Sequence, residues 1–194
     1  MAKKKRVWYP GAVYHITNRG NRRSDIFKDE EDYQVYLTIL KQAMEKYSFT
    51  VYSYCLMTNH VHMQIATGDV EIWKIMRFIN LAYTKYFNNK YNFIGHLFQG
   101  RYKAELIEND AYNLQTSRYI HLNPVQAAMV KTPVEYQWSS YGIYMGQVKS
   151  DIVTEEKILS YFKDNSRELY KIYVESKLIN QEGDQEIVEL VGVK

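Results

Sequence analysis

Apolar and polar residues alternate with the period of a β-strand in four segments of the chain. These segments are residues 13–17, 49–57, 60–66 and 97–107. The turn-forming residues 18–21 end the first. Only Thr58 and Asn59 separate the second from the third, so we expect these two strands to form an antiparallel hairpin. Gly100, inside the fourth segment, indicates a bulge or a close backbone approach.

Three longer segments carry apolar residues at helical spacing: residues 29–47, 69–91 and 110–123. Acidic residues open the first of them, where the helix dipole favours negative charge. Asn109 or Asp110 is expected to cap the third helix. Pro124 should end that helix at Asn123, because proline disfavours the helical conformation of the residue before it.

The order strand, helix, strand, strand, helix, strand, helix predicts an α+β fold of the ferredoxin-like, split βαβ type. Such a fold has a central antiparallel sheet, with the first and third strands in the middle and helices on one face. We expect a main domain over residues 1–130. Residues 131–194 are expected to form a C-terminal accessory helical segment, with helices near 154–162 and 166–179 and an acidic tail over 181–194.

A single cysteine and the absence of long apolar runs limit the class of protein. Cys55 alone cannot form an internal disulfide or a cysteine-based zinc site, and its apolar surroundings predict a core position. No run approaches the roughly 20 apolar residues of a membrane span, and the N-terminus lacks the apolar core of a signal peptide. We therefore expect no membrane association and a cytoplasmic protein.

Charge is distributed unevenly along the chain. Although the net charge is only +3, residues 1–150 hold 19 basic and 12 acidic residues, and seven basic residues precede the first acid, Asp25. This polarity favours a polyanionic partner such as nucleic acid. The 19 tyrosines also favour a nucleic-acid partner, since a tyrosine ring can stack on an unpaired base with a gain of about 1–3 kcal/mol per base. An ordinary basic tail and half-buried tyrosines are the alternative interpretation.

His60 and His62 flank Val61 on a predicted strand. The pleat sends both imidazoles to one face, roughly 6–7 Å apart, so that one cation could bridge them. Such a pair alone is more often structural than functional. With no thiolate nearby, a third, oxygen ligand and open water positions would suit Mg²⁺ or Mn²⁺, which could polarise a phosphodiester. A four-ligand structural zinc site has no obvious set of residues.

Three separated motifs combine at a specific spacing. They are YHITNRG at residues 14–20, LMTNHVH at residues 56–62 and YIHLNPV at residues 119–125. In order and spacing they resemble the REP-associated tyrosine transposases, within the HUH single-tyrosine transposase superfamily. The resemblance runs from about residue 13 to 141. Related transposases often have glutamine four residues after the tyrosine, whereas this chain has asparagine followed by proline.

The resemblance implies a catalytic domain over residues 1–130 that recognises a hairpin in single-stranded DNA and cuts beside it with a divalent metal. His60 and His62 would bind the metal, with Asn123 as the third ligand. Tyr119 would be the nucleophile and would form a covalent 5′-phosphotyrosine. Independently of the resemblance, Tyr119 and Asn123 share one helix face, with Cβ atoms about 5–6 Å apart. Tyr112 is the nearest rival, and a packed, structural Tyr119 is the other alternative.

Cationic residues near the first and fourth strands are candidate DNA contacts. The predicted set is Asn18, Arg19, Arg22 and Arg23, in a flexible loop, together with Arg101 and Lys103. For the last two, a solvated strand face is an equal alternative. His15 is a secondary candidate that could assist DNA or the metal site, or could be a structural histidine. His96 and His121 are interpreted as incidental.

The leading functional hypothesis is therefore a single-stranded DNA endonuclease and strand transferase, that is, a transposase. A non-catalytic nucleic-acid-binding module on the same sheet is the main alternative, and it would need neither the histidine pair nor a tyrosine in register with it. A replication initiator or plasmid relaxase would keep the chemistry, but such proteins are typically longer. The sequence leaves both a monomer and a homodimer open.

Overall fold

A four-stranded antiparallel sheet forms the centre of the fold in the computed structural model, which describes residues 7–176. Its strands are β1 (Val13–Arg19), β2 (Thr50–Met57), β3 (His60–Ala66) and β4 (Lys103–Ile107). They lie in the order β2-β3-β1-β4, so that β1 and β3 are central. The predicted ferredoxin-like, α+β arrangement is thereby confirmed.

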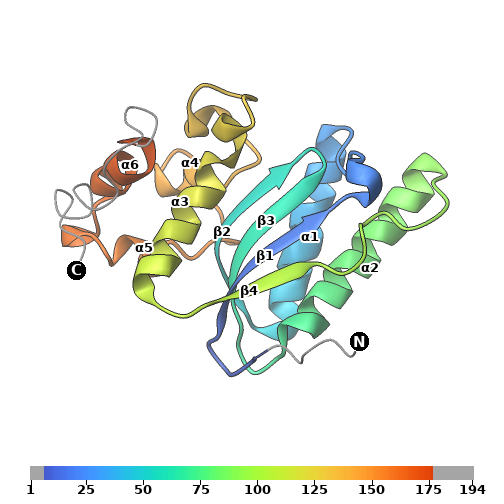
Figure 1. Ribbon diagram of the computed structural model, residues 1–194, viewed down its shortest axis with the longest axis horizontal. Coiled ribbons are helices and arrows are strands. Elements are labelled where there is room, and N and C mark those ends of the chain that lie inside the picture. The colour runs from blue at the N-terminus through green and yellow to red at the C-terminus, as the bar shows by residue number, and fades with distance from the viewer. Residues whose placement is uncertain (1–6, 177–194) are drawn as a thin grey trace.

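Helices cover both faces of the sheet (Figure 1), so the expectation of helices on one face alone is wrong. Helices α1 (Glu30–Tyr47) and α2 (Ile72–Tyr91) pack together on one face. On the other face lies α3 (Asp110–Gln126), which contacts β2, β3 and β4. The C-terminal elements gather beside α3: η2 (Pro133–Glu135), α4 (Tyr141–Tyr144), α5 (Glu156–Leu159), η3 (Lys163–Asn165) and α6 (Arg167–Glu175).

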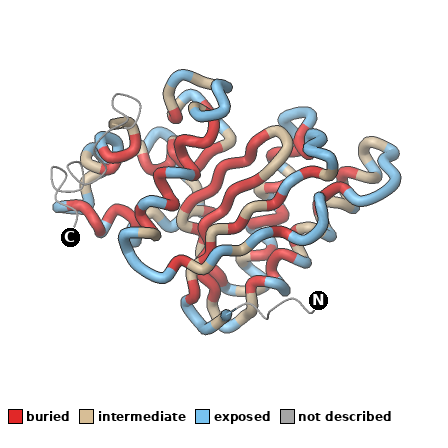
Figure 2. The backbone as a smooth tube through the Cα atoms, in the orientation of Figure 1, coloured by how far each residue is buried: buried red, intermediate tan, exposed pale blue. Residues whose placement is uncertain are grey.

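The pleat of the two central strands separates core residues from site residues. On β1, Tyr14 and Ile16 are buried in the main core with α1 and α2, whereas His15 and Thr17 point to the opposite face. Strand β3 divides in the same way, with Val61, Met63 and Ile65 in that core and His60 and His62 on the other side. Figure 2 shows the buried path of these central strands.

The β2–β3 hairpin has the predicted two-residue turn. Met57 pairs with His60, which leaves Thr58 and Asn59 as the connection. The register with β1 then places Thr17 opposite His62. The turn thus decides which β3 side chains reach the face that α3 partly covers.

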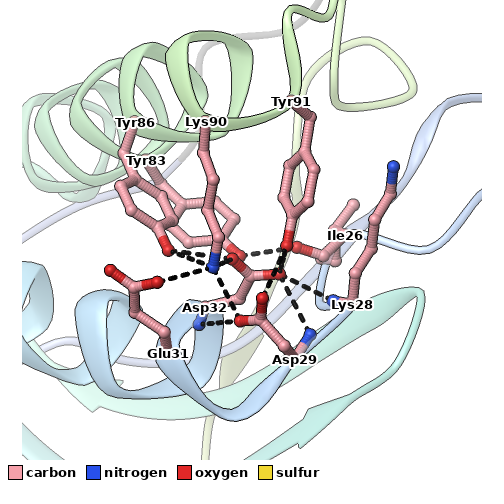
Figure 3. Close-up of polar contacts among 9 residues, drawn as sticks. All are labelled: Ile26, Lys28, Asp29, Glu31, Asp32, Tyr83, Tyr86, Lys90 and Tyr91. Carbon is pink, nitrogen blue, oxygen red and sulfur yellow. Dashed lines mark hydrogen bonds and ion pairs between the residues drawn. The ribbon is translucent and has the colours of Figure 1, made fainter.

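A polar network fastens the start of α1 to the end of α2 (Figure 3). Asp29 caps α1 in a reciprocal capping box with Asp32, whose side chain is fully buried. Asp32 accepts hydrogen bonds from Tyr86 Oη (2.9 Å), Tyr91 Oη (2.8 Å) and Lys90 Nζ (3.0 Å). Burial alone would raise the pKa of this carboxyl, but the hydrogen bonds that it accepts hold it below its ordinary value.

Two predicted strand boundaries are wrong. Strand β1 continues through Asn18 and Arg19, so these residues do not belong to a flexible loop. Strand β4 begins only at Lys103; Phe98 makes an isolated bridge to Gly20, and Gly100 has a positive φ of 67°. Residues 97, 98 and 102 belong to the loop before β4, and their side chains are buried in the main core. Their apolar character explains why the segment resembled a strand in the sequence.

The predicted end of α3 at Asn123 is also wrong, because the helix passes through Pro124 to Gln126. Proline disfavours a helical residue before it, but at this position both Asn123 and Pro124 are buried by tertiary packing. The helix ends two residues later, so the missing N–H of Pro124 interrupts only its final turn. Asn109 is the observed cap and accepts from Tyr112 N at 2.8 Å.

The C-terminal segment builds a second core against α3. Leu114 and Leu122 of α3 pack there with Tyr141, Tyr144 and Tyr170. The helix predicted over 154–162 is shorter than expected, as α5. The helix predicted over 166–179 is present as α6 within the described residues, and residues 177–179 and the predicted acidic tail lie outside them. Cys55 is fully buried, as predicted. Within residues 7–176, no helix is both long and apolar enough to cross a membrane.

Candidate active site

A cavity of about 700 Å³ lies between the sheet and α3, on the face opposite α1 and α2. All four strands contribute to its wall, and α3 contributes one side along most of its length. Its lining includes His15, Thr17, Arg19, His60, His62, Lys103, Glu105, Tyr112, Arg118, Tyr119 and Asn123. The fold thus brings the first, second and third sequence motifs to one place.

The two histidines of the pair both line this cavity. Their ring centroids lie 4.9 Å apart with an interplanar angle of 82°, which is closer than the separation predicted from the pleat. Nδ1 of His60 lies 2.6 Å from Oδ1 of Asn59. Since an amide oxygen only accepts hydrogen bonds, Nδ1 carries the proton and Nε2 of His60 keeps its lone pair.

His15 contacts the deeper member of the pair. Its Nε2 lies 3.0 Å from Nδ1 of His62, and the two rings are stacked with centroids 5.2 Å apart. Thr17 Oγ1 lies 3.4 Å from the same His62 nitrogen. His15 is therefore joined directly to the histidine pair.

Burial lowers the pKa of all three imidazoles and so favours their neutral form. Burial, reinforced by Arg19, lowers the pKa of His60 to about 4. Burial lowers that of His62 to about 2, with smaller contributions from His15, His60 and Arg19. The pKa of His15 is also lowered by burial, which Glu105 partly offsets. Neutral imidazole is the form that coordinates metal ions.

Tyr119 projects from α3 toward these rings. It is 43% exposed, and its ring centroid lies 5.5 Å from that of His62 and 5.6 Å from that of His15, edge-on to both. Tyr119 is therefore not a packed core residue. Tyr112 also lines the cavity, but its hydroxyl donates to Oε2 of Glu105 at 3.5 Å, whereas the Tyr119 ring is the one that contacts the histidine rings.

Asn123 lies one turn after Tyr119 on the cavity side of α3. Its Nδ2 donates to the Tyr119 carbonyl at 3.0 Å. Because this hydrogen bond uses the amide nitrogen, Oδ1 is the atom that could serve as a ligand. The continuation of α3 through Pro124 keeps both residues within one helix.

The donors around the cavity fit a small divalent cation. Within residues 7–176, no group of three or more His, Cys, Asp or Glu side chains is placed to hold a metal ion. A site here would combine two imidazoles with the amide oxygen of Asn123 and leave positions for water and DNA oxygens. Mixed nitrogen and oxygen ligands without thiolate suit Mg²⁺ or Mn²⁺.

The candidate DNA contacts separate into three groups. Arg19 and Lys103 are exposed and line the cavity. Arg22, Arg23 and Arg101 are exposed outside it, the first two in η1 (Asn21–Arg23) with positive φ angles of 54° and 61°. The prediction of Asn18 as a DNA contact was wrong, because its side chain is buried and donates to Asn80 Oδ1 of α2 at 2.9 Å.

Two cavity residues, Glu105 and Arg118, were missed in the sequence. Glu105 pairs with His15 across β1 and β4, so the sheet order and register would have found it. Arg118 is nearly buried, and its guanidinium carbon lies 4.7 Å from the ring centroid of Tyr173 on α6. No local pattern indicates that contact, because it depends on where the C-terminal segment packs.

Two separate sets of buried hydrogen bonds, one at Asn113 and one at His121, hold α3 in place. Gln64 Nε2 of β3 donates to the Asn113 backbone carbonyl at 2.7 Å. His121 is fully buried, with Nδ1 2.7 Å from Tyr170 Oη and Nε2 2.7 Å from Ser140 Oγ. Burial lowers the pKa of His121 to about 3. His121 is thus a structural residue that ties the helix of Tyr119 to the C-terminal segment.

A family model and a solved structure of similar fold match this chain. The family model described as "Transposase IS200 like" matches residues 9–123, more than half of the chain. A solved REP-associated tyrosine transposase, described as bound to a REP hairpin, is 20% identical with a TM-score of 0.64 over 79% of this chain and 94% of its own. Two further structures have TM-scores below 0.5. A putative transposase from Deinococcus radiodurans has a TM-score of 0.44 and 17% identity, over 61% of this chain and 95% of its own. A tRNA(His) guanylyltransferase from Saccharomyces cerevisiae has a TM-score of 0.39 and 12% identity, over 81% of this chain and 80% of its own. No curated protein matches.

Proposed function

Because the chain belongs to the IS200-like transposase family, we propose that it cuts and rejoins single-stranded DNA through Tyr119 in a metal-dependent reaction. The observation that carries this proposal is the exposed Tyr119 ring standing against His62 at the wall of one cavity. A module that only bound nucleic acid would need no such juxtaposition.

In the cleavage step, Oη of Tyr119 attacks the phosphorus of a DNA phosphodiester. A bond forms between that oxygen and phosphorus, and the bond from phosphorus to the 3′ oxygen breaks. The phenol proton passes to water and the departing 3′ oxygen takes up a proton, which leaves a free 3′ hydroxyl. Attack of a 3′ hydroxyl on the phosphotyrosine reverses these bond changes and joins the strands.

A phenol with an ordinary pKa near 10 is a weak nucleophile at neutral pH and needs assistance. His60, His62 and Asn123 would hold the divalent cation. When bound, Mg²⁺ or Mn²⁺ supplies Lewis acidity that polarises the phosphate. Arg19 and Lys103 at the same cavity would orient the strand through its phosphates.

We propose a DNA hairpin beside the cleavage site as the recognised structure. The support is the solved transposase of the same fold, which is described as bound to a REP hairpin. The exposed cations Arg22, Arg23 and Arg101 lie outside the cavity and are available for phosphates away from the cut.

The experiment is incubation of the protein with a pool of end-labelled, single-stranded hairpins and Mn²⁺. We expect a cut strand with a 3′ hydroxyl and a covalent protein–DNA band that resists denaturation. The same pool in excess chelator is the control. Binding without cutting, over a broad set of hairpins and metals, would favour the non-catalytic binding module.

A further inference from the structure

Glu105 lies beside His15, on the strand next to it. The two residues pair directly across β1 and β4, so their side chains share the cavity face of the sheet. Oε2 of Glu105 lies 4.0 Å from Nδ1 of His15. Because Nε2 of His15 lies 3.0 Å from Nδ1 of His62, the carboxylate, His15 and His62 form a continuous row.

Each neutral imidazole in this row carries one proton, on either Nδ1 or Nε2. The carboxylate of Glu105 has no proton to donate, so it influences which nitrogen of His15 is protonated. At 4.0 Å the two groups are too far apart for a hydrogen bond, but the negative charge of an ionised Glu105 attracts a proton and so favours the tautomer of His15 with the proton on Nδ1. Nε2 of that neutral His15 is then an acceptor. The 3.0 Å contact therefore requires His62 to donate from Nδ1, which leaves the lone pair on Nε2 of His62.

The opposite arrangement would prevent ligation by His62. If Nε2 of His15 carried the proton, Nδ1 of His62 would accept it, and Nε2 of His62 would hold a hydrogen in place of a lone pair. Thr17 Oγ1, at 3.4 Å, does not decide between the two, because a hydroxyl both donates and accepts. The negative charge of Glu105 distinguishes the two tautomer arrangements, because it favours a proton on Nδ1 of His15.

We propose that His15 and Glu105 are positioning residues that keep the proton of His62 on Nδ1, so that Nε2 is presented as a metal ligand. Histidine ligands are commonly oriented in this way by a partner of the second ring nitrogen. His60 already has such a partner in Asn59. The inference rests on the proposed function only in taking His62 as a ligand.

The test reads the tautomer directly, in metal-free protein labelled with ¹⁵N. Long-range proton–nitrogen correlation spectra show which ring nitrogen of each histidine is protonated. We expect His62 to carry its proton on Nδ1 in the unmodified protein. Glu105→Met and His15→Leu should populate the other tautomer, whereas His15→Gln, whose amide oxygen accepts, should restore the Nδ1 form.

Affinity for Mn²⁺, measured without DNA by electron paramagnetic resonance of the free ion, is the second readout. Loss of such a partner typically weakens metal binding about 10–100-fold. We expect a loss in that range for His15→Leu, a smaller loss for Glu105→Met and recovery in His15→Gln. Glu108→Met, which removes an exposed acid just beyond β4, is the matched control for charge and should change neither readout.

A proton on Nε2 of His62 in the unmodified protein would overturn the proposal, as would Mn²⁺ affinity unchanged by both His15→Leu and Glu105→Met. Glu105 is 62% exposed, so Glu105→Met keeps the test open even if His15→Leu fails to fold. Neither readout uses DNA. A protein that shows the expected tautomer and affinities but never cuts DNA would reject the proposed function and leave this inference standing.

Discussion

The ring of Tyr119 stands nearly perpendicular to that of His62, at 84°, with their centroids 5.5 Å apart in the same chain. The nucleophile candidate and the histidine pair therefore come together without a second protomer. The C-terminal segment contributes to this placement, because Leu114 and Leu122 of α3 are buried against it.

Replacing either histidine of the pair should abolish cutting while leaving the fold intact. His60→Ala or His62→Ala removes one of three proposed ligands, so we expect Mn²⁺ binding to fall below detection together with cleavage. Cleavage assays and thermal melting measure the two effects. His96→Ala, at an exposed position outside the cavity, is the control. Full cleavage by His62→Ala in excess chelator would contradict the assignment of the metal site.

Binding of single-stranded hairpins should weaken steeply with salt, because cations at the cavity displace counterions from phosphates. Arg19→Gln and Lys103→Gln should each reduce the slope of log affinity against log salt by about one. Lys149→Gln, exposed outside the cavity, should leave it unchanged. The measurement is a fluorescence anisotropy titration over a salt series. Equal affinity for a blunt duplex would count against this account.

The Asp32 network predicts a stability that depends on pH. The folded-state pKa of Asp32 is lowered, so its stabilisation is fully present above the ordinary aspartate pKa of about 3.9 and is lost as the pH falls below it. Asp32→Asn should cost about 2 kcal/mol at pH 7, because charged hydrogen bonds are lost. The cost should shrink in acid. Urea unfolding at pH 7 and pH 3 measures this, with exposed Asp69→Asn as the control. An equal cost at both pH values would refute the explanation.

The buried hydrogen bonds of His121 predict that the C-terminal segment stabilises α3. Tyr170→Phe removes the hydroxyl that partners His121 and Ser117, so it should lower the free energy of unfolding by about 2 kcal/mol. Tyr9→Phe, at an exposed tyrosine, is the control. A chain ending at residue 130 should not unfold cooperatively, whereas one ending at 176 should. If the shorter chain were equally stable, residues 1–130 would be an independent domain.

The sequence predicts the sheet order, the hairpin turn and the grouping of His60, His62 and Tyr119, since these follow from short-range periodicity and from motifs. The errors arise where tertiary packing overrides local preference. Pro124 lies inside a helix because that helix is buried, and Asn18 is buried because β1 is longer than its alternating pattern. Glu105 becomes visible only when β4 is placed beside β1, and Arg118 only when α6 is placed over α3.

The most direct test of the account is to locate the covalent bond to DNA. The protein is incubated with a labelled hairpin and Mn²⁺, digested, and analysed by mass spectrometry for the tyrosine that carries a 5′ phosphate. We predict that Tyr119 alone carries it, and that Tyr119→Phe loses the adduct but keeps hairpin affinity, whereas Tyr112→Phe still forms it. An adduct on Tyr112, or one that persists in Tyr119→Phe, would contradict the assignment.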